Sequence, residues 1–398
     1  MARFRLTGLD GRNPLHFLAA LGLLRLGDRI RPGMRLGWSF EGAVRNPVLE
    51  PVADFADLER LAESMAAWLR ELGKVIGSDS GVDRELGEIK KRVKGIEREL
   101  KQARRSLKSA KIPAEAKENL RLETVAPLEL ALEQAKESQS ELQRRKALAM
   151  GAGIAHLGDR IGVRKEIFRV LAEGALLGWA EAARMGQRDP RPVMDDPWLV
   201  VAELPALASE VLLDGSDLKP TPFSFGNGAS GQELLKDFRN LTGDVAVGRL
   251  LATFLGEPVE SRFKEEGTSL NWDPSDYRPH SQNARDPQKM PKRVDVGANL
   301  LAYLGLSFLT VVPVGPRRAL TLGDRTVGTD RRNPGTALHW PLWDHLLPAD
   351  MVALLFCHRL TTPSGRLTNG ICEIWRAKVI MPDKKRPYFQ PAVLLASA

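Results

Sequence analysis

The sequence predicts a mixed α+β globular body with an inserted antiparallel coiled-coil helical hairpin. Three observations predict this fold class: a strand-like segment followed by a capped helix near the start, a long heptad-patterned segment, and several short β-like runs in the last third. A chain of 398 residues can hold two globular parts and such a hairpin. We expect an N-terminal α+β part over 1–82, the hairpin over 83–148, a mainly helical part over 149–270 and a basic α+β part over 271–398.

The start of the chain predicts a strand, a turn and a helix. Residues 3–9 alternate between polar and apolar side chains, as half-buried strands do. Asp10-Gly11 predicts a turn, Asn13 is a good helix cap, and Pro14 suits the first helical position. The predicted helix carries leucines on one face, namely Leu15, Leu18, Leu21 and Leu24.

Further elements are predicted before the hairpin. Residues 35–40 alternate as a strand does, and Pro47 and Pro51 indicate a loop after it. An amphipathic helix is predicted over 58–72. Residues 76–81 are rich in glycine and serine, which indicates a flexible boundary.

The charged helical hairpin is the most informative element. In its first arm apolar residues recur with spacing 3-4-3-4-3-4, which is typical of a coiled-coil helix: Leu86, Ile89, Val93, Ile96, Leu100, Ala103 and Leu107. Ile112-Pro113 ends this arm, since proline lacks the N–H group that a helix needs. The second arm is interrupted by Pro127, and its apolar positions are Leu120, Leu128, Leu132, Ala135 and Leu142. Such an arm can reach a partner or a nucleic acid, or can be a passive structural element.

The chain after the hairpin predicts mainly helices and then strands. Helices are predicted over 164–185, 231–241, 244–255 and 298–306, with a proline-rich loop over 189–197. A strand end is predicted at 270–274, followed by an irregular basic loop over 275–296. Strands are predicted over 308–314 and 371–380.

Neither the cysteines nor the apolar segments indicate secretion or membrane insertion. Cys357 and Cys372 are the only cysteines and have no CxxC spacing, so a disulfide framework is excluded and a reducing, cytoplasmic location is expected. Charged residues interrupt the N-terminal segment, which does not predict a signal peptide. The most apolar stretch, 300–314, is too short to cross a bilayer, so we expect it to be buried core.

The residues that could carry catalysis form no pattern typical of a metal site. The six histidines are His16, His156, His280, His339, His345 and His358. They show no HxxxH or HExxH spacing, so no metal and no cofactor is expected. Asp273 and Asp276 with a histidine could hold a divalent ion, as in a nuclease, but their Trp-Asp-Pro-Ser-Asp context favours a turn with Asx hydrogen bonds.

A glycine-rich turn precedes the helix predicted over 231–241. Gly226 to Gly231, with Asn227, could let helix N–H groups bind a phosphate of a nucleic-acid backbone. The alternative is a turn that directs Phe223 and Phe225 into the core. No Gly-Lys-Ser/Thr is present, which excludes a nucleotide-hydrolysing P-loop.

Positive charge is concentrated in two stretches. The formal net charge is +8, from 58 Lys+Arg and 50 Asp+Glu. Residues 83–148 contain 17 basic and 12 acidic residues, and residues 272–398 contain 17 and 10, whereas the rest contains 24 and 28. Concentration of this kind is expected where phosphate is bound, and a solvated basic face is the alternative.

The candidate nucleic-acid-binding residues lie mainly in basic segments that are rich in Pro, Gly, Asn and Gln, which are typical of surface loops. Arginine binds phosphate in a bidentate manner, and the neighbouring Trp375, Tyr388 and Phe389 could stack on bases. With Asn227 from the glycine turn, the candidates are Arg278, Arg285, Lys289, Lys292, Arg293, Arg317, Arg318, Arg331, Arg332, Lys384, Lys385 and Arg386.

Five short segments resemble a known family. They are GLDGRNPLHFLAALGLLR at 8–25, FSFGNG at 223–228, LNWDPSDYR at 270–278, GANLLA at 297–302 and WPLW at 340–343. Together they resemble CRISPR-associated proteins of type I-U, also called type I-G. The resemblance implies a large-subunit-like component of a Cascade-like complex, which would hold the guide RNA end, meet the flanking duplex motif and present the complex to the helicase–nuclease. The charged hairpin departs from this family pattern.

We therefore expect a non-catalytic RNA- and DNA-binding subunit of a CRISPR RNA-guided surveillance complex in antiviral defence. The expected partners are guide RNA, target DNA, other CRISPR effector subunits and the helicase–nuclease, with no membrane partner. Two alternatives stay open: a metal-dependent nuclease of a phage-defence system, and a purely protein-binding scaffold subunit.

Overall fold

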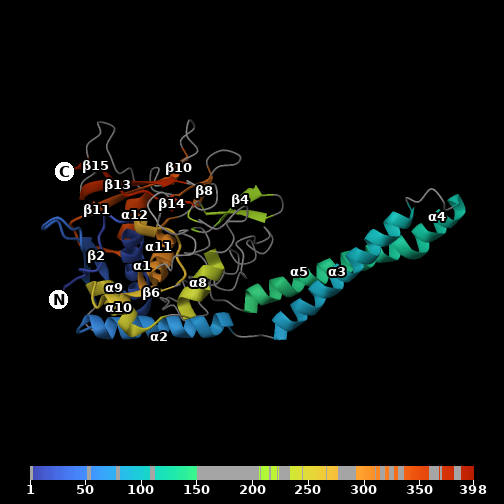
Figure 1. Ribbon diagram of the computed structural model, residues 1–398, viewed down its shortest axis with the longest axis horizontal. Coiled ribbons are helices and arrows are strands. Elements are labelled where there is room, and N and C mark those ends of the chain that lie inside the picture. Colours follow the sequence, from blue (N-terminus) through green and yellow to red (C-terminus); the bar gives the residue numbers. More distant parts are fainter. Residues whose placement is uncertain are drawn as a thin grey trace, which may run out of the picture. The chain divides into compact units, whose positions relative to one another are not determined.

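Helices and antiparallel sheets together make this a mixed α+β protein in the computed structural model (Figure 1). Two units are distinguished by their internal contacts: Met1–Ile76 with Ala152–Ala398, and Gly77–Gly151. The structure describes residues 3–51, 55–77, 81–107, 113–149, 206, 208–214, 217–221, 223, 234–243, 245–265, 267–276, 293–309, 311–313, 319–321, 327–329, 336–357, 367, 370–380 and 387–398.

The first helix confirms the predicted cap. Strand β1 is Phe4–Arg5, and helix α1 is Pro14–Ile30. The side chain of Asn13 accepts a hydrogen bond from the backbone N–H of Leu15 at 2.9 Å, and Pro14 occupies the first turn, where its missing N–H is not needed. The helix is buried on nearly all sides and not only on its leucine face, because other elements surround it.

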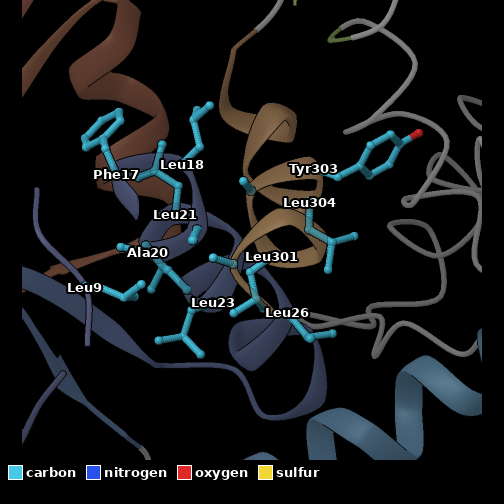
Figure 2. Packing of buried hydrophobic residues seen from close by; sticks show 14 of the residues in the cluster. Leu9, Phe17, Leu18, Ala20, Leu21, Leu23, Leu26, Leu301, Tyr303 and Leu304 are labelled. Atoms are coloured by element: carbon cyan, nitrogen blue, oxygen red, sulfur yellow. The ribbon is translucent and has the colours of Figure 1, made fainter. Parts of the chain in front are cut away.

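Helix α1 packs closely against α11, Val296–Gly305 (Figure 2). The contact depends on two glycines. A Cβ at Gly22 would collide with the carbonyl oxygen of Leu301, and one at Gly305 would collide with that of Leu18. The two backbones therefore approach to a distance that no larger residue permits. The helix predicted over 298–306 is confirmed, and a 3₁₀ turn, Leu306–Phe308, extends it.

A four-stranded antiparallel sheet has the order β1-β3-β2-β12. Its other strands are β2 (Arg35–Trp38), β3 (Pro47–Glu50) and β12 (Leu347–Pro348). The loop predicted at Pro47 is wrong, because this proline begins β3 and its carbonyl accepts a hydrogen bond from Leu6 N–H. Proline is tolerated at the first position of a strand, where a missing donor costs little.

The second sheet has seven strands in the order β14-β13-β11-β10-β9-β8, with β15 paired to β13. All its pairs are antiparallel. The strand predicted over 371–380 is confirmed as β13. The strands are β8 (Val311–Pro313), β9 (Ala319–Thr321), β10 (Val327–Thr329), β11 (Thr336–Trp343), β13 (Ile371–Ile380), β14 (Tyr388–Phe389) and β15 (Val393–Ser397).

The remaining elements of this unit are helices and two short ladders. The ladders pair β4 (Ala208–Asp214) with β5 (Asp217–Pro220), and β6 (Phe263–Glu265) with β7 (Arg293–Asp295). The helices are α2 (Leu58–Gly77), α8 (Leu234–Gly243), α9 (Val247–Leu255), α10 (Val259–Arg262), the 3₁₀ turn Pro274–Asp276 and α12 (Ala349–Cys357). The strand end predicted at 270–274 is wrong, since this segment is irregular and held by side-chain hydrogen bonds.

The described residues of the unit Gly77–Gly151 form helices, with Pro113 before the second of them. They are α3 (Gly81–Leu107), α4 (Ala114–Leu120), the π-helical turn η1 (Arg121–Val125) and α5 (Ala126–Ala149). Leu100, Ala103 and Val125 form its apolar cluster, against which three further leucines pack. Pro127 is the second residue after η1 and lies in the first turn of α5. Because a proline ring clashes with the carbonyl four residues earlier, the wider π turn lets the helix continue through it.

Several predicted segments lie outside the described residues: the helix over 164–185, the loop over 189–197, the glycine turn from 224 and most of the basic loop over 275–296. Of the stretch 300–314, residues 300–309 are buried as predicted. None of the helices that the structure describes is long and apolar enough to span a membrane.

Candidate functional site

One of the predicted nucleic-acid-binding residues lies in the described part of the chain. Arg293 begins β7, is exposed, and pairs in register with Glu265 of β6. It stands two residues before Asp295, which caps α11. The other candidates lie outside the described residues: Asn227, Arg278, Arg285, Lys289, Lys292, Arg317, Arg318, Arg331, Arg332, Lys384, Lys385 and Arg386.

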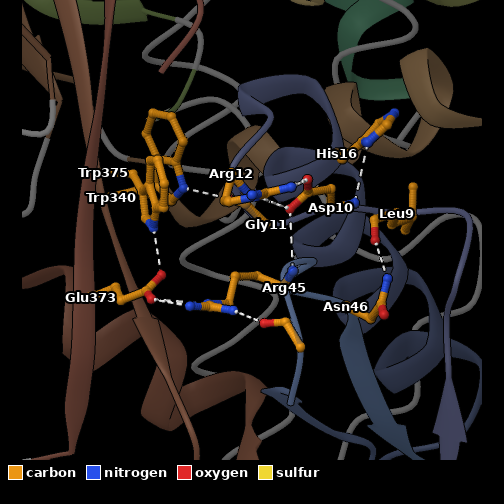
Figure 3. A network of polar contacts seen from close by, with 11 residues as sticks. Leu9, Asp10, Gly11, Arg12, His16, Arg45, Asn46, Trp340, Glu373 and Trp375 are labelled. Carbon is orange, nitrogen blue, oxygen red and sulfur yellow. Dashed lines mark hydrogen bonds and ion pairs between the residues drawn. The ribbon is translucent and has the colours of Figure 1, made fainter. Parts of the chain in front are cut away.

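The loop before α1 is the centre of a polar network (Figure 3). The Asp10 carboxylate accepts hydrogen bonds from Nε of Arg12 at 3.0 Å and from its Nη2 at 2.6 Å. The backbone N–H groups of Arg12 and Arg45 donate to the same carboxylate. Burial alone would raise the pKa of Asp10, but these hydrogen bonds and the charge of Arg12 outweigh burial and hold the pKa below its ordinary value.

A partly buried ion pair joins this region to the seven-stranded sheet (Figure 3). Arg45 donates from Nε at 2.9 Å and from Nη2 at 2.7 Å to Oε1 of Glu373 on β13, and Trp375 Nε1 donates to Oε2 of the same residue at 2.7 Å. Trp340 on β11 donates to the carbonyl of Gly11 at 2.7 Å. Glu373 is 6% exposed, so its charge depends on these donors.

A second buried ionic cluster lies at the start of α11. Nε of Arg262 donates to Oδ2 of Asp295 at 2.6 Å, while Thr253 and the N–H of Ala298 donate to Oδ1. Nη2 of Arg262 also lies 3.2 Å from Nε2 of His16. A guanidinium can only donate, so a hydrogen bond here forms in the tautomer whose Nε2 carries no proton.

The surroundings of His16 agree with a neutral ring. Burial of the ring lowers the pKa of His16 below 6.5, and the charge of Arg262 lowers it further, although Asp273 and Asp295 oppose this shift. The backbone N–H of Asp10 lies 3.2 Å from Nδ1. A neutral ring can accept a hydrogen bond at only one of its two nitrogens, so Asp10 N–H and Arg262 are alternative donors to it. An imidazolium ion would be repelled on both sides.

Asp273 forms the turn that its sequence context predicts. Its Oδ1 accepts from the backbone N–H of Ser275 at 2.9 Å, which is an Asx turn, and from Nδ2 of Asn13 at 3.2 Å. Among the residues that the structure describes, no group of three or more His, Cys, Asp or Glu side chains is arranged to hold a metal ion. The described geometry of Asp273 thus supports a structural role.

The five family-like segments meet in one place. Trp272 Nε1 donates to the Phe223 carbonyl at 3.0 Å, and Leu270 N–H donates to Oδ1 of Asn299 at 2.9 Å. Trp340 bonds the loop before α1, and α1 packs on α11, as described above. Their described residues therefore build a shared core, which explains why none of these segments has a catalytic pattern.

The described residues with the most regular charge pattern lie on α3. Five exposed basic residues recur along this helix with spacing 3-4-3-4: Lys91, Lys94, Arg98, Lys101 and Arg105. No ion pair joins any of the five to another residue in the described part of the chain. In contrast, Arg104 binds Glu129 at 2.6 Å and Lys136 binds Glu97 at 3.2 Å, between α3 and α5. We call the five residues the basic stripe.

Sequence reasoning missed the buried ion pairs. Arg45, Glu373, Arg262 and Asp295 stand far apart along the chain, and single charged residues within strands or loops carry no periodic signal. Asp295 alone could have been found, as an acidic residue directly before a helical apolar run. No protein-family model matches this chain, and no curated protein shows significant similarity to it.

Proposed function

We propose that this protein is a non-catalytic nucleic-acid-binding subunit of a CRISPR RNA-guided surveillance complex. The observation that carries this proposal is the separation of charge along the chain: 83–148 and 272–398 each hold 17 basic residues against 12 and 10 acidic ones. The remainder has an excess of acidic residues, 28 against 24. Charge segregated in this way produces a local positive field that attracts a polyanion.

In this proposal the unit Gly77–Gly151 is an inserted antiparallel coiled-coil arm. Two ion pairs support this assignment. One pair joins Arg104 of α3 to Glu129 of α5, and the other joins Glu97 of α3 to Lys136 of α5. The residue on α3 is seven positions earlier in the second pair, and the residue on α5 is seven positions later. A heptad register between helices of opposite direction produces this relation. Burial of Leu86, Val93, Leu100 and Ala103 agrees with the seam that the sequence predicts.

The basic loops of the larger unit would contact the phosphate backbone of guide RNA and target DNA. Binding through phosphates releases counterions, so log K should fall linearly with log salt concentration, by about 0.9 per phosphate contacted on duplex DNA. Filter binding of the full chain to guide RNA and to target duplex measures this slope. A flat salt dependence for both nucleic acids would contradict the proposal.

Two arginines provide the sharpest test of the loops. Reversal at Arg331→Glu and Arg332→Glu should weaken binding while leaving tryptophan fluorescence of the folded protein unchanged. Arg60→Glu with Arg70→Glu is the matched control, because these exposed arginines of α2 change the net charge equally. An equal loss of affinity for nucleic acid in both double variants would mean that the total charge of the protein, and not these two arginines, governs binding.

A scaffold subunit is the competing function, in which the α3–α5 unit binds only protein. Deleting residues 83–148 separates the two functions. If the shortened chain still binds nucleic acid but no longer enters the effector complex, the unit is a protein-binding arm. If assembly is retained and affinity for nucleic acid drops, the unit contributes to nucleic-acid binding.

A further inference from the structure

The basic stripe has the same spacing as the apolar seam of α3. The seam positions Leu86, Ile89, Val93, Ile96 and Leu100 become the stripe positions 91, 94, 98, 101 and 105 when each number is raised by five. At 3.6 residues per turn, five residues correspond to a rotation of about 140° around the helix axis. The two rows therefore run parallel to one another on nearly opposite sides of the helix.

The row of charge is continuous and accessible. All five side chains are exposed, and from Lys91 to Arg105 the row extends about 21 Å at a rise of 1.5 Å per residue. Arg84 is also exposed and lies seven residues before Lys91, so it continues the row by two turns. No acidic residue occupies a stripe position. A polyanion of similar length would meet positive charge at every turn.

The exposed residues of α3 disfavour a membrane surface as the occupant of the stripe. Helices that bind in a membrane interface place apolar side chains next to their basic face. On α3 the apolar row is already buried against the cluster that α5 shares, with Leu86, Val93 and Leu100 between 5% and 8% exposed. The stripe thus offers charge without an apolar partner for acyl chains.

The composition of the unit disfavours single-stranded nucleic acid as well. Proteins that bind single strands stack bases on aromatic side chains, and arginine can assist them. Residues 77–151 contain no Phe, Tyr or Trp. Duplex nucleic acid needs no such platform, because its phosphates lie on the outside and carry about one charge per 1.7 Å of axis.

We propose that the basic stripe of α3 is a sequence-independent binding surface for the phosphate backbone of double-stranded nucleic acid. This inference rests on the proposed function and assigns one surface and one class of ligand to it. The stripe would hold the duplex through its phosphates, because contacts of Lys and Arg to the backbone fix the position of a duplex but carry no sequence information.

The test compares variants of the full chain by fluorescence anisotropy. The probes are a mixed-sequence duplex about 30 base pairs long and one of its single strands, titrated over about 0.05–0.3 M salt. One variant combines Lys91→Glu, Arg98→Glu and Arg105→Glu, and a milder variant has Gln at the same three positions, which preserves helix propensity. The charge-matched control combines Arg3→Glu, Arg35→Glu and Arg60→Glu, all exposed residues of the larger unit.

If the stripe binds duplex, loss of three phosphate contacts should reduce the salt slope by about 2.7. If the variant and the wild type bind the duplex equally near 1 M salt, this smaller slope weakens duplex binding by the variant about a hundredfold at about 0.15 M salt. The control should keep its slope, and the stripe variants should lose more affinity for the duplex than for the single strand. Circular dichroism should show unchanged helix content in the Gln variant.

Three results would overturn the assignment: an unchanged slope in both stripe variants, an equal loss of duplex affinity in the control, or a loss of single-strand affinity in the stripe variants as large as their loss of duplex affinity. A stripe variant that retains duplex affinity but no longer self-associates in sedimentation would instead identify a second copy of this chain as the occupant. If the wild type binds neither probe nor guide RNA even at low salt, the proposed function fails, and not only the stripe.

Discussion

The buried pair Arg262–Asp295 offers a test of how α10 and the start of α11 are held together. The two side chains are 10% and 3% exposed, and Asp295 has Thr253 Oγ1 and the N–H of Ala298 as further donors. Removing one member of a buried pair costs about 3–5 kcal/mol, because the other charge stays buried without compensation. We expect Arg262→Met to cost about 3 kcal/mol, since two donors remain at Asp295.

A double-mutant cycle measures the coupling. Asp295→Asn alone should also cost about 3 kcal/mol, because it leaves the guanidinium unpaired, whereas the double variant should cost well below the sum of the two. We expect a coupling free energy of about 2–3 kcal/mol. Arg12→Met is the control. Its side chain is 36% exposed, so its pair with Asp10 should contribute about 1 kcal/mol or less.

Urea unfolding followed by tryptophan fluorescence is the appropriate assay. All eight tryptophans lie outside residues 77–151, so their fluorescence reports only the larger unit. Additive costs of the two single variants, with a coupling below about 0.5 kcal/mol, would refute the reasoning, because independent sites behave in that way.

Three further predictions use other parts of the chain. Gly22→Ala should destabilise the larger unit by about 1–3 kcal/mol, since a Cβ collides with the backbone of α11, and urea unfolding followed by tryptophan fluorescence measures this. Gly95→Ala, in open space on α3, should stabilise its helix by about 0.5–1 kcal/mol, which thermal unfolding followed by circular dichroism measures. Burial lowers the pKa of His16 and, with the charge of Arg376, that of His339, so the unfolded chain binds more protons just below pH 6.5. The free energy of unfolding should therefore fall as pH decreases from about 6.5, by at most about 1.4 kcal/mol per pH unit for each histidine. A free energy of unfolding that increases at lower pH would contradict this. Burial, followed by the charge of Asp344, raises the pKa of Cys372, so iodoacetamide should label this thiol more slowly at neutral pH than free cysteine, as peptide mass spectrometry can show.

Local patterns in the sequence were sufficient for the elements that are defined by short-range rules. The cap at Asn13 with Pro14, the helix after Asp295 and strand β13 appear as predicted, because each depends on neighbouring residues. The loop expected at Pro47 is instead strand β3. Its pairing with β1 and β2 is a long-range interaction, which overrides the local tendency of proline to end a strand.

The candidate site could be predicted in part. Clustering of basic residues is visible in composition, and the stripe on α3 follows from the helical period once the seam is known. The stripe was nevertheless missed as a separate surface, because charged residues between seam positions look like an ordinary solvated face until their partners are known. The partners of Glu97 and Arg104 on α5 show which charges are used within the unit and which are not.

The most direct test of polyanion binding is a lysine footprint. The full chain is acetylated briefly with and without duplex or guide RNA, and the modified lysines are quantified by mass spectrometry. The proposal predicts protection of Lys91, Lys94 and Lys101 by duplex and of Lys289, Lys292, Lys384 and Lys385 by nucleic acid, while Lys136, which pairs with Glu97, keeps its reactivity. Equal reactivity of all these lysines with and without nucleic acid would contradict it.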